Sequence, residues 1–147
     1  MEKTRKLLKV ESIIILFFAG LSLITWVTEL IFADFDNIVI PDGAPENALL
    51  IAKIAFFVIA FVLLIPNIYV GIKGLKMAKN PDSSKAHIVW AKVLLVIDVL
   101  GLISPVINIV QDVNVSSNVS TVLSLLLSIA IFFDYIRYAT AVSKANN

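Results

Sequence analysis

One carboxylate, Asp98, lies near the middle of a long apolar segment, where a charged side chain is costly. On a helix, residues three and four positions apart share a face. Counted in these steps, Asp98 belongs to a stripe of polar, small and helix-perturbing residues: His87, Ala91, Leu94, Asp98, Gly101, Pro105 and Asn108. The opposite face is uniformly aliphatic: Val93, Val96, Ile97, Leu100 and Ile103. Charged groups within membrane spans usually face protein or water and mark functional sites. Asp98 is therefore the first residue to consider for function.

Two serines share the depth of Asp98 when residues are counted from the ends of their own apolar segments. These are Ser22 and Ser128, and all three residues fall near the midplane. In one interpretation, Asp98 keeps its proton and donates a hydrogen bond to a serine or a helix carbonyl. Such a bond would hold two helices together by about 0.6–2 kcal/mol. In the other, Asp98 is a proton or cation site in a wet cavity, with Asn67 and Asn108 along the path. The sequence leaves both interpretations open.

An ion pair is the second polar feature that the sequence predicts. Glu29 and Lys53 lie on consecutive segments, each roughly 6–8 Å inside the outer boundary at about 1.5 Å of rise per residue. Lys53 is the one basic residue outside the inner half of the segments, which favours a carboxylate partner. The alternative is that each side chain reaches the outer interface independently.

The residues needed for catalysis are missing. There is no Cys and a single His, His87, so neither a thiol nucleophile nor a His-based or Cys-based metal site is expected. No glycine-rich phosphate loop and no pair of catalytic carboxylates at a sensible depth is present. The acidic stretch 34–39 begins like a calcium loop, but Val39 occupies the position that requires glycine. We expect no enzyme activity, no cofactor, no metal and no nucleic-acid partner.

The elements that must position these residues are four apolar segments. The chain has 147 residues, of which 59% are hydrophobic and 16% charged, whereas soluble domains have roughly half and a quarter. The segments cover residues 12–33, 48–72, 88–110 and 119–139. Each has about the 20 residues that cross a hydrocarbon core as a helix. The sequence predicts one transmembrane domain over residues 1–147.

The basic residues predict the orientation of this domain. Nine of the twelve Lys and Arg residues lie at the N-terminus, between the second and third segments, or after the fourth, and two more, Lys92 and Arg137, lie near the inner ends of the third and fourth segments. The two opposite connections contain none and carry acidic residues. Under the positive-inside rule, both termini are cytoplasmic. Short links make successive helices antiparallel neighbours, so the predicted fold is an all-α, up-down four-helix transmembrane bundle.

Small and polar residues recur in steps of three and four in all four segments, which is the seam spacing of packed membrane helices. In the second segment, Gly71 and Gly74 with Ala78 form a smooth patch. Their spacing is close to, but not, the dimerisation signature GxxxG. We expect the patch to serve close packing within the chain, with oligomerisation as the alternative.

The stretch around the inner connection resembles small uncharacterised four-span membrane proteins of Gram-positive bacteria. The residues that carry the resemblance are Tyr69-Val-Gly71-Ile-Lys-Gly74, Asn80-Pro81 and 86–90. The resemblance implies a multi-pass protein of a bacterial plasma membrane and transfers no functional residue.

Two functions follow from these observations. The first is a non-catalytic membrane protein that acts by association with itself or with another membrane protein, as an accessory subunit or an immunity-type protector. The second is a small oligomeric transporter or channel that uses Asp98 as a proton or cation site. Beyond the lipid bilayer itself, the sequence selects no ligand.

Overall fold

The computed structural model describes residues 1–32, 47–81 and 84–145, and of residues 29–32 and 56 it describes the backbone alone. This part of the chain is all-helical and contains no strand. The helices are α1 (Glu2–Phe32), α2 (Ala48–Lys79), α3 (Ala86–Gly101), α4 (Ile103–Val110) and α5 (Val115–Lys144). The predicted all-α class is confirmed.

Four of the helical stretches in the described residues are long and apolar enough to cross a membrane: Glu2–Thr28, Ala48–Lys79, Ala86–Val110 and Val115–Lys144. Such segments form helices because a helix satisfies every backbone hydrogen bond within itself, as a hydrocarbon environment requires. They extend beyond the apolar segments that the sequence delimits. At 31 residues, α1 is about 46 Å long, which exceeds the thickness of a hydrocarbon core, about 30 Å.

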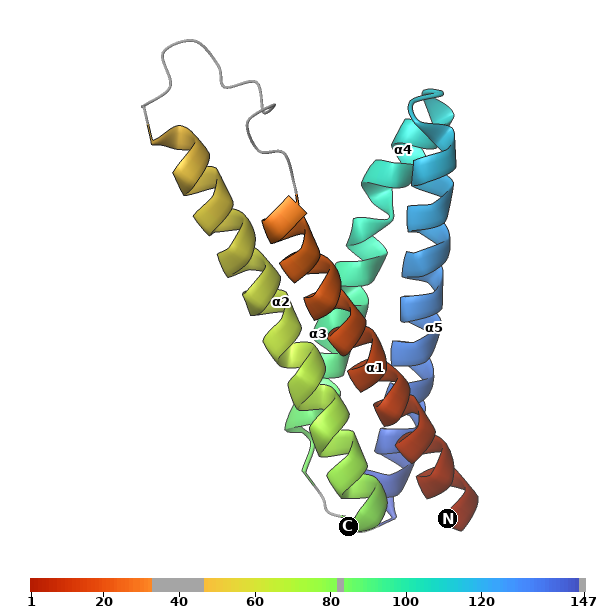
Figure 1. Cartoon of the computed structure of the whole chain (residues 1–147). Coiled ribbons are helices and arrows are strands. Elements are labelled where there is room, and N and C mark those ends of the chain that lie inside the picture. The colour runs from red at the N-terminus through yellow and green to blue at the C-terminus, as the bar shows by residue number, and fades with distance from the viewer. Residues whose placement is uncertain (33–46, 82–83, 146–147) are drawn as a thin grey trace.

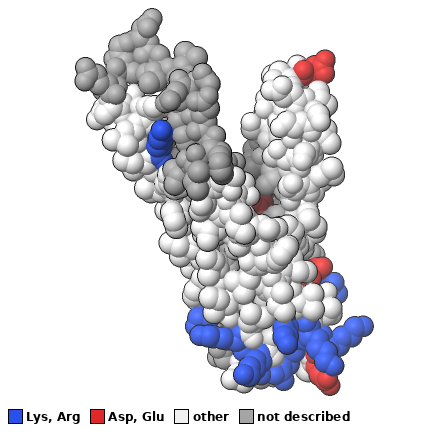
Figure 2. All heavy atoms as spheres, in the orientation of Figure 1, with Lys and Arg blue, Asp and Glu red and all other residues white. Residues whose placement is uncertain are grey.

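The helices form two antiparallel pairs that converge at one end (Figure 1). One pair is α1 with α2, and the other is α5 with α3 and α4. Both termini lie at the end where the pairs meet, and the pairs diverge toward the opposite end. Lys and Arg side chains gather at the converging end (Figure 2). We call it the basic end, and we call the opposite end, where α2 begins and α4 meets α5, the open end.

The hydrophobic core lies mostly in the half of the molecule nearer the basic end. Its fully buried side chains include Leu8, Val70, Met77, Tyr135 and Val142. The Tyr135 hydroxyl donates a hydrogen bond of 2.9 Å to the carbonyl of Val70, which ties α5 to α2. All four long helical stretches contribute to this core, so it closes the molecule at the basic end.

Two glycines allow the close helix contacts at this end. A Cβ atom on Gly71 would lie 2.5 Å from Leu16 Cγ, and one on Gly74 would lie 2.5 Å from Tyr135 Cε2. The Cβ atom added at Gly74 would also clash with the hydroxyl of Ser12. The smooth patch on α2 therefore serves packing within the chain, which confirms that prediction.

The two faces of the third segment differ in burial as the sequence predicts. On its polar stripe, His87, Ala91, Leu94 and Pro105 are buried and Asp98 is half-buried, although Gly101 is exposed. On the aliphatic face, the five side chains are between 40% and 59% exposed. Asp98 therefore faces the other helices.

A break divides this segment between α3 and α4. Pro105 has no amide hydrogen, so the carbonyl of Gly101 loses its helical partner. The Leu102 N–H bonds the carbonyl of Val99 at 3.2 Å instead of that of Asp98. Because the helical hydrogen bonds are interrupted at this point, α4 continues along α5 while α3 packs against both α2 and α5. The break lies one turn from Asp98.

Arg5 secures the basic end of α2. Its Nε donates a hydrogen bond of 2.9 Å to the carbonyl of Ala78, and its Nη2 donates one of 2.6 Å to that of Lys79. The last carbonyls of a helix have no partner within the helix, and a cation near them also interacts favourably with the negative end of the helix dipole.

Replacing Arg5 by glutamine is expected to lower the free energy of unfolding by about 1–2 kcal/mol. Thermal unfolding in detergent would measure this, with the exposed Lys3→Gln as a control that leaves the midpoint unchanged. Equal midpoints for the Arg5 variant and the native protein would contradict the assignment.

Candidate functional site

A cavity of about 380 Å³ lies between the two helix pairs, on the open side of the core. Residues of α1, α2, α3 and α5 line it, and most of them are apolar. Figure 2 shows a notch between the two pairs that widens toward the open end. The polar side chains of the lining are Ser22, Asn67, Asp98, Ser124 and Ser128.

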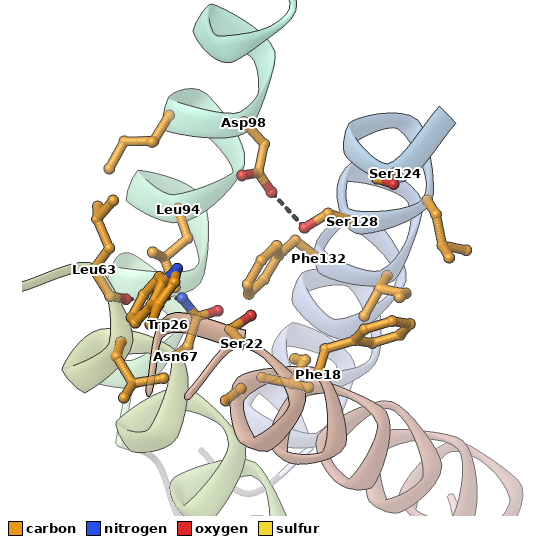
Figure 3. A pocket seen from close by; sticks show the side chains of 16 residues that line it. Phe18, Ser22, Trp26, Leu63, Asn67, Leu94, Asp98, Ser124, Ser128 and Phe132 are labelled. Atoms are coloured by element: carbon orange, nitrogen blue, oxygen red, sulfur yellow. Dashed lines mark hydrogen bonds between the residues drawn. The ribbon is translucent and has the colours of Figure 1, made fainter. Parts of the chain in front are cut away.

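Asp98 and Ser128 point toward each other from α3 and α5 (Figure 3). The Ser128 hydroxyl donates a hydrogen bond of 2.6 Å to one carboxylate oxygen of Asp98, and both residues are half-buried. Asp98 is the central residue of the candidate span Ala86–Val110. The structure thus places a hydrogen-bonded carboxyl group at the middle of a span and on the wall of a cavity.

Ser22 and Asn67 lie on the other helix pair, across the cavity from this bond (Figure 3). The side-chain amide of Asn67 donates to the carbonyl of Leu63 in its own helix at 2.8 Å. Its amide oxygen is the acceptor that remains for a ligand. Both residues are half-buried. Four of the five residues that the sequence proposes for a polar site therefore line a single cavity.

Asn108, the fifth residue, does not line it. Its amide lies 3.5 Å from the side-chain oxygen of Asn118, at the turn between α4 and α5. In this turn, Asp112 and Asn114 adopt the left-handed conformation, which short polar side chains tolerate. Asn118 also donates to the carbonyls of Val113 and Asn114, at 2.8 and 3.1 Å. We therefore assign Asn108 to the α4–α5 turn.

The proposed ion pair includes Glu29, whose side chain is not among those that the structure describes. Lys53 is half-buried in the second turn of α2. It does not line the cavity. The pair therefore stays a prediction.

Sequence reasoning missed Trp26 and Phe132 in the aromatic part of the lining. Together with Phe18, which shares the inward seam of Ser22, they contribute to the cavity wall (Figure 3). Trp26 lies four residues after Ser22 and so shares its helix face, which is the signal that could have found it. His87, which shares the stripe of Asp98, is 1% exposed, and its ring meets the ring of Tyr135 edge-on, with centroids 6.1 Å apart.

The electrostatics of the cavity depend on one group. Of the described residues that line it, Asp98 is the only charged one, and none is basic. An uncompensated carboxylate in a mostly apolar cavity is unfavourable, so Asp98 is stabilised by taking up a proton or by binding a cation. Within the described residues, no three His, Cys, Asp or Glu side chains come together as metal ligands. The arrangement can exchange a proton for a cation at one carboxyl group.

Comparisons with known proteins return no match. No protein-family model matches the chain, and no curated protein or solved structure is significantly similar to it.

Proposed function

We propose that this is a multi-pass, non-catalytic protein of a bacterial plasma membrane, in which Asp98 binds a proton or a cation during transport. The basic end is cytoplasmic in this proposal, because eleven of the twelve Lys and Arg residues belong to it. The open end then faces outward.

One observation carries the proposal: Asp98 lies on the wall of a cavity instead of in a sealed core. A carboxyl group that only holds helices together would be enclosed by them. Here the cavity separates the two helix pairs around Asp98, and the packed core closes the basic end. A midplane site with access from one side is the arrangement expected for one state of alternating access.

The second state would require the open end to close and the basic end to loosen. The contacts to be released are then those of Tyr135 with Val70 and of Arg5 with the last carbonyls of α2. The break at Leu102 supplies a flexible point next to Asp98, since two backbone carbonyls there lack regular helical partners. Ser128 would hold the carboxylate form of Asp98 through its hydroxyl.

Proton flux in proteoliposomes tests the proposal. The native protein is expected to dissipate a pH gradient, and Asp98→Asn is expected to abolish this flux, because the amide keeps size and hydrogen bonding but cannot titrate. The matched control is Asp112→Asn in the exposed α4–α5 turn, which should transport as the native protein does. Flux that survives in Asp98→Asn would refute the role of Asp98.

Association with a partner is the second candidate. It is favoured by the exposed apolar side chains that α1 and α2 carry among the described residues, such as Ile24, Leu50 and Ile54. Absence of flux in both the native protein and Asp98→Asn, with both equally stable, would favour this candidate. Asp98 would then be a helix-packing residue.

A further inference from the structure

We infer that the substrate of this cavity is a lipophilic organic cation, such as a quaternary ammonium or phosphonium ion with aromatic or aliphatic substituents. This inference rests on the proposed function, since it names the substrate class of the same site. Three properties of the cavity support it: its volume, its charge and its aromatic lining.

The volume selects a small organic molecule. Pockets for such ligands usually measure roughly 300–1,000 Å³, and this one measures about 380 Å³. A desolvated inorganic cation is held by several oxygen ligands at close range. Most of the lining here is apolar and offers no such ligands. An inorganic ion is also small, so it would leave most of the cavity unfilled.

The charge of the cavity selects a cation. Asp98 is the single charged residue of the lining among the described residues. Ser128 donates to one of its oxygens, and the other oxygen is available to face a positive group. Because Ser22 and Asn67 are neutral, nothing else in the lining compensates the carboxylate. An anionic ligand would meet an unscreened like charge in a low-dielectric site, which is strongly unfavourable.

The aromatic side chains select a lipophilic cation of low hydration. Phe18, Trp26 and Phe132 come from α1 and α5 and lie around the same space as Asp98 (Figure 3). Aromatic faces attract organic cations, and tryptophan does so most strongly. The aliphatic part of the wall, which includes Leu63 and Leu94, would cover the substituents. The Asp98 carboxylate matches the charge of such a cation, and the aromatic and aliphatic side chains match its apolar substituents.

Exchange at Asp98 couples the ligand to a proton. The protonated carboxyl group releases its proton to water as the cation enters, so that one positive charge replaces another. No covalent bond other than the O–H bond breaks, and none forms. Binding of the cation should therefore release up to one proton per site.

The test uses two probes of the same shape and opposite charge, tetraphenylphosphonium and tetraphenylborate. Their binding to the full-length protein in detergent would be measured by equilibrium dialysis. We expect saturable binding of tetraphenylphosphonium at one site per chain, and no saturable binding of tetraphenylborate. Asp98→Asn should weaken phosphonium binding by about 30-fold or more, as expected for the loss of one partner of a buried charge pair. Trp26→Leu should weaken it by about 3-fold to 30-fold, and Asp112→Asn should leave it unchanged.

The outcomes separate this inference from the proposed function. Binding of phosphonium that depends on Asp98 supports the inference, whether or not proton flux is found. Without flux, even when the phosphonium is supplied as the exchanging ion, the protein would be a receptor for such cations, and transport would be refuted. Proton flux through Asp98 without phosphonium binding, or with equal binding of tetraphenylborate, overturns the inference and leaves the proposed function standing. Neither binding nor flux, with the variants folded, overturns both.

Discussion

Alanine in place of Gly74 is expected to lower the free energy of unfolding by about 1–3 kcal/mol, the usual cost of overpacking a well-packed interior. The added Cβ would lie 2.5 Å from Tyr135 Cε2 and would clash with the Ser12 hydroxyl. Neither neighbour can easily move. Tyr135 and Ser12 are both fully buried, and the Tyr135 hydroxyl is held by the carbonyl of Val70 at 2.9 Å. The substitution should therefore force α2 away from α1 and α5 at the basic end.

Gly20→Ala is the matched control, because Gly20 is also a helical glycine and nothing lies within 4 Å of its added Cβ. Alanine there should be neutral or stabilising by up to about 1 kcal/mol, since it lowers the entropy of the unfolded chain. Thermal unfolding of both variants in the same detergent measures the difference. Equal midpoints for the two variants would show that the basic end is not packed as described.

In the proposed transport, this packing matters because the core closes the basic end. If Gly74→Ala loosens that end without unfolding the protein, Asp98 would be reachable from both sides, and exchange would no longer be coupled. Under the proposal, one-sided access to Asp98 therefore depends on the packing of the basic end.

Much of the fold could be predicted from the sequence, since continuous apolar segments of about 20 residues are the signature of membrane-spanning helices. The four segments, the inward face of the third and the use of Gly71 and Gly74 followed from hydropathy and from spacing in steps of three and four. The divergence of the helix pairs did not, because seams in steps of three and four predict helices that stay in contact at a small crossing angle. Nor did the position of the break at Leu102, although Pro105 pointed to a disturbed turn.

The candidate site was predicted in part. Counting residues from the segment ends placed Asp98, Ser22 and Ser128 at one depth, and the structure brings all three to one cavity. The same count could not place Asn108, whose position depends on how α4 turns into α5. The depth count alone also did not single out Trp26, although its spacing of four residues from Ser22 places both on one helix face. Depth follows from sequence, whereas lateral position follows from helix packing.

Access of water to the cavity is the central claim, and two serines of α1 allow it to be tested directly. Ser22 lines the cavity and is half-buried, whereas Ser12 lies in the basic-end core with 0% exposure. The chain has no Cys, so Ser22→Cys and Ser12→Cys each introduce a single thiol. A thiol reacts as the thiolate, which forms in water and not in lipid or a packed core.

The decisive measurement is labelling of these two variants with a cationic, membrane-impermeant methanethiosulfonate, added separately to each face of sealed vesicles. Repeating the labelling with Asp98→Asn added to each variant ensures that attraction to Asp98 does not drive the reaction. We expect Ser22→Cys to react only from the open-end face and Ser12→Cys to react from neither face. No labelling of Ser22→Cys from either face, or labelling from the basic face alone, would contradict an outward-opening aqueous cavity and with it the role given to Asp98.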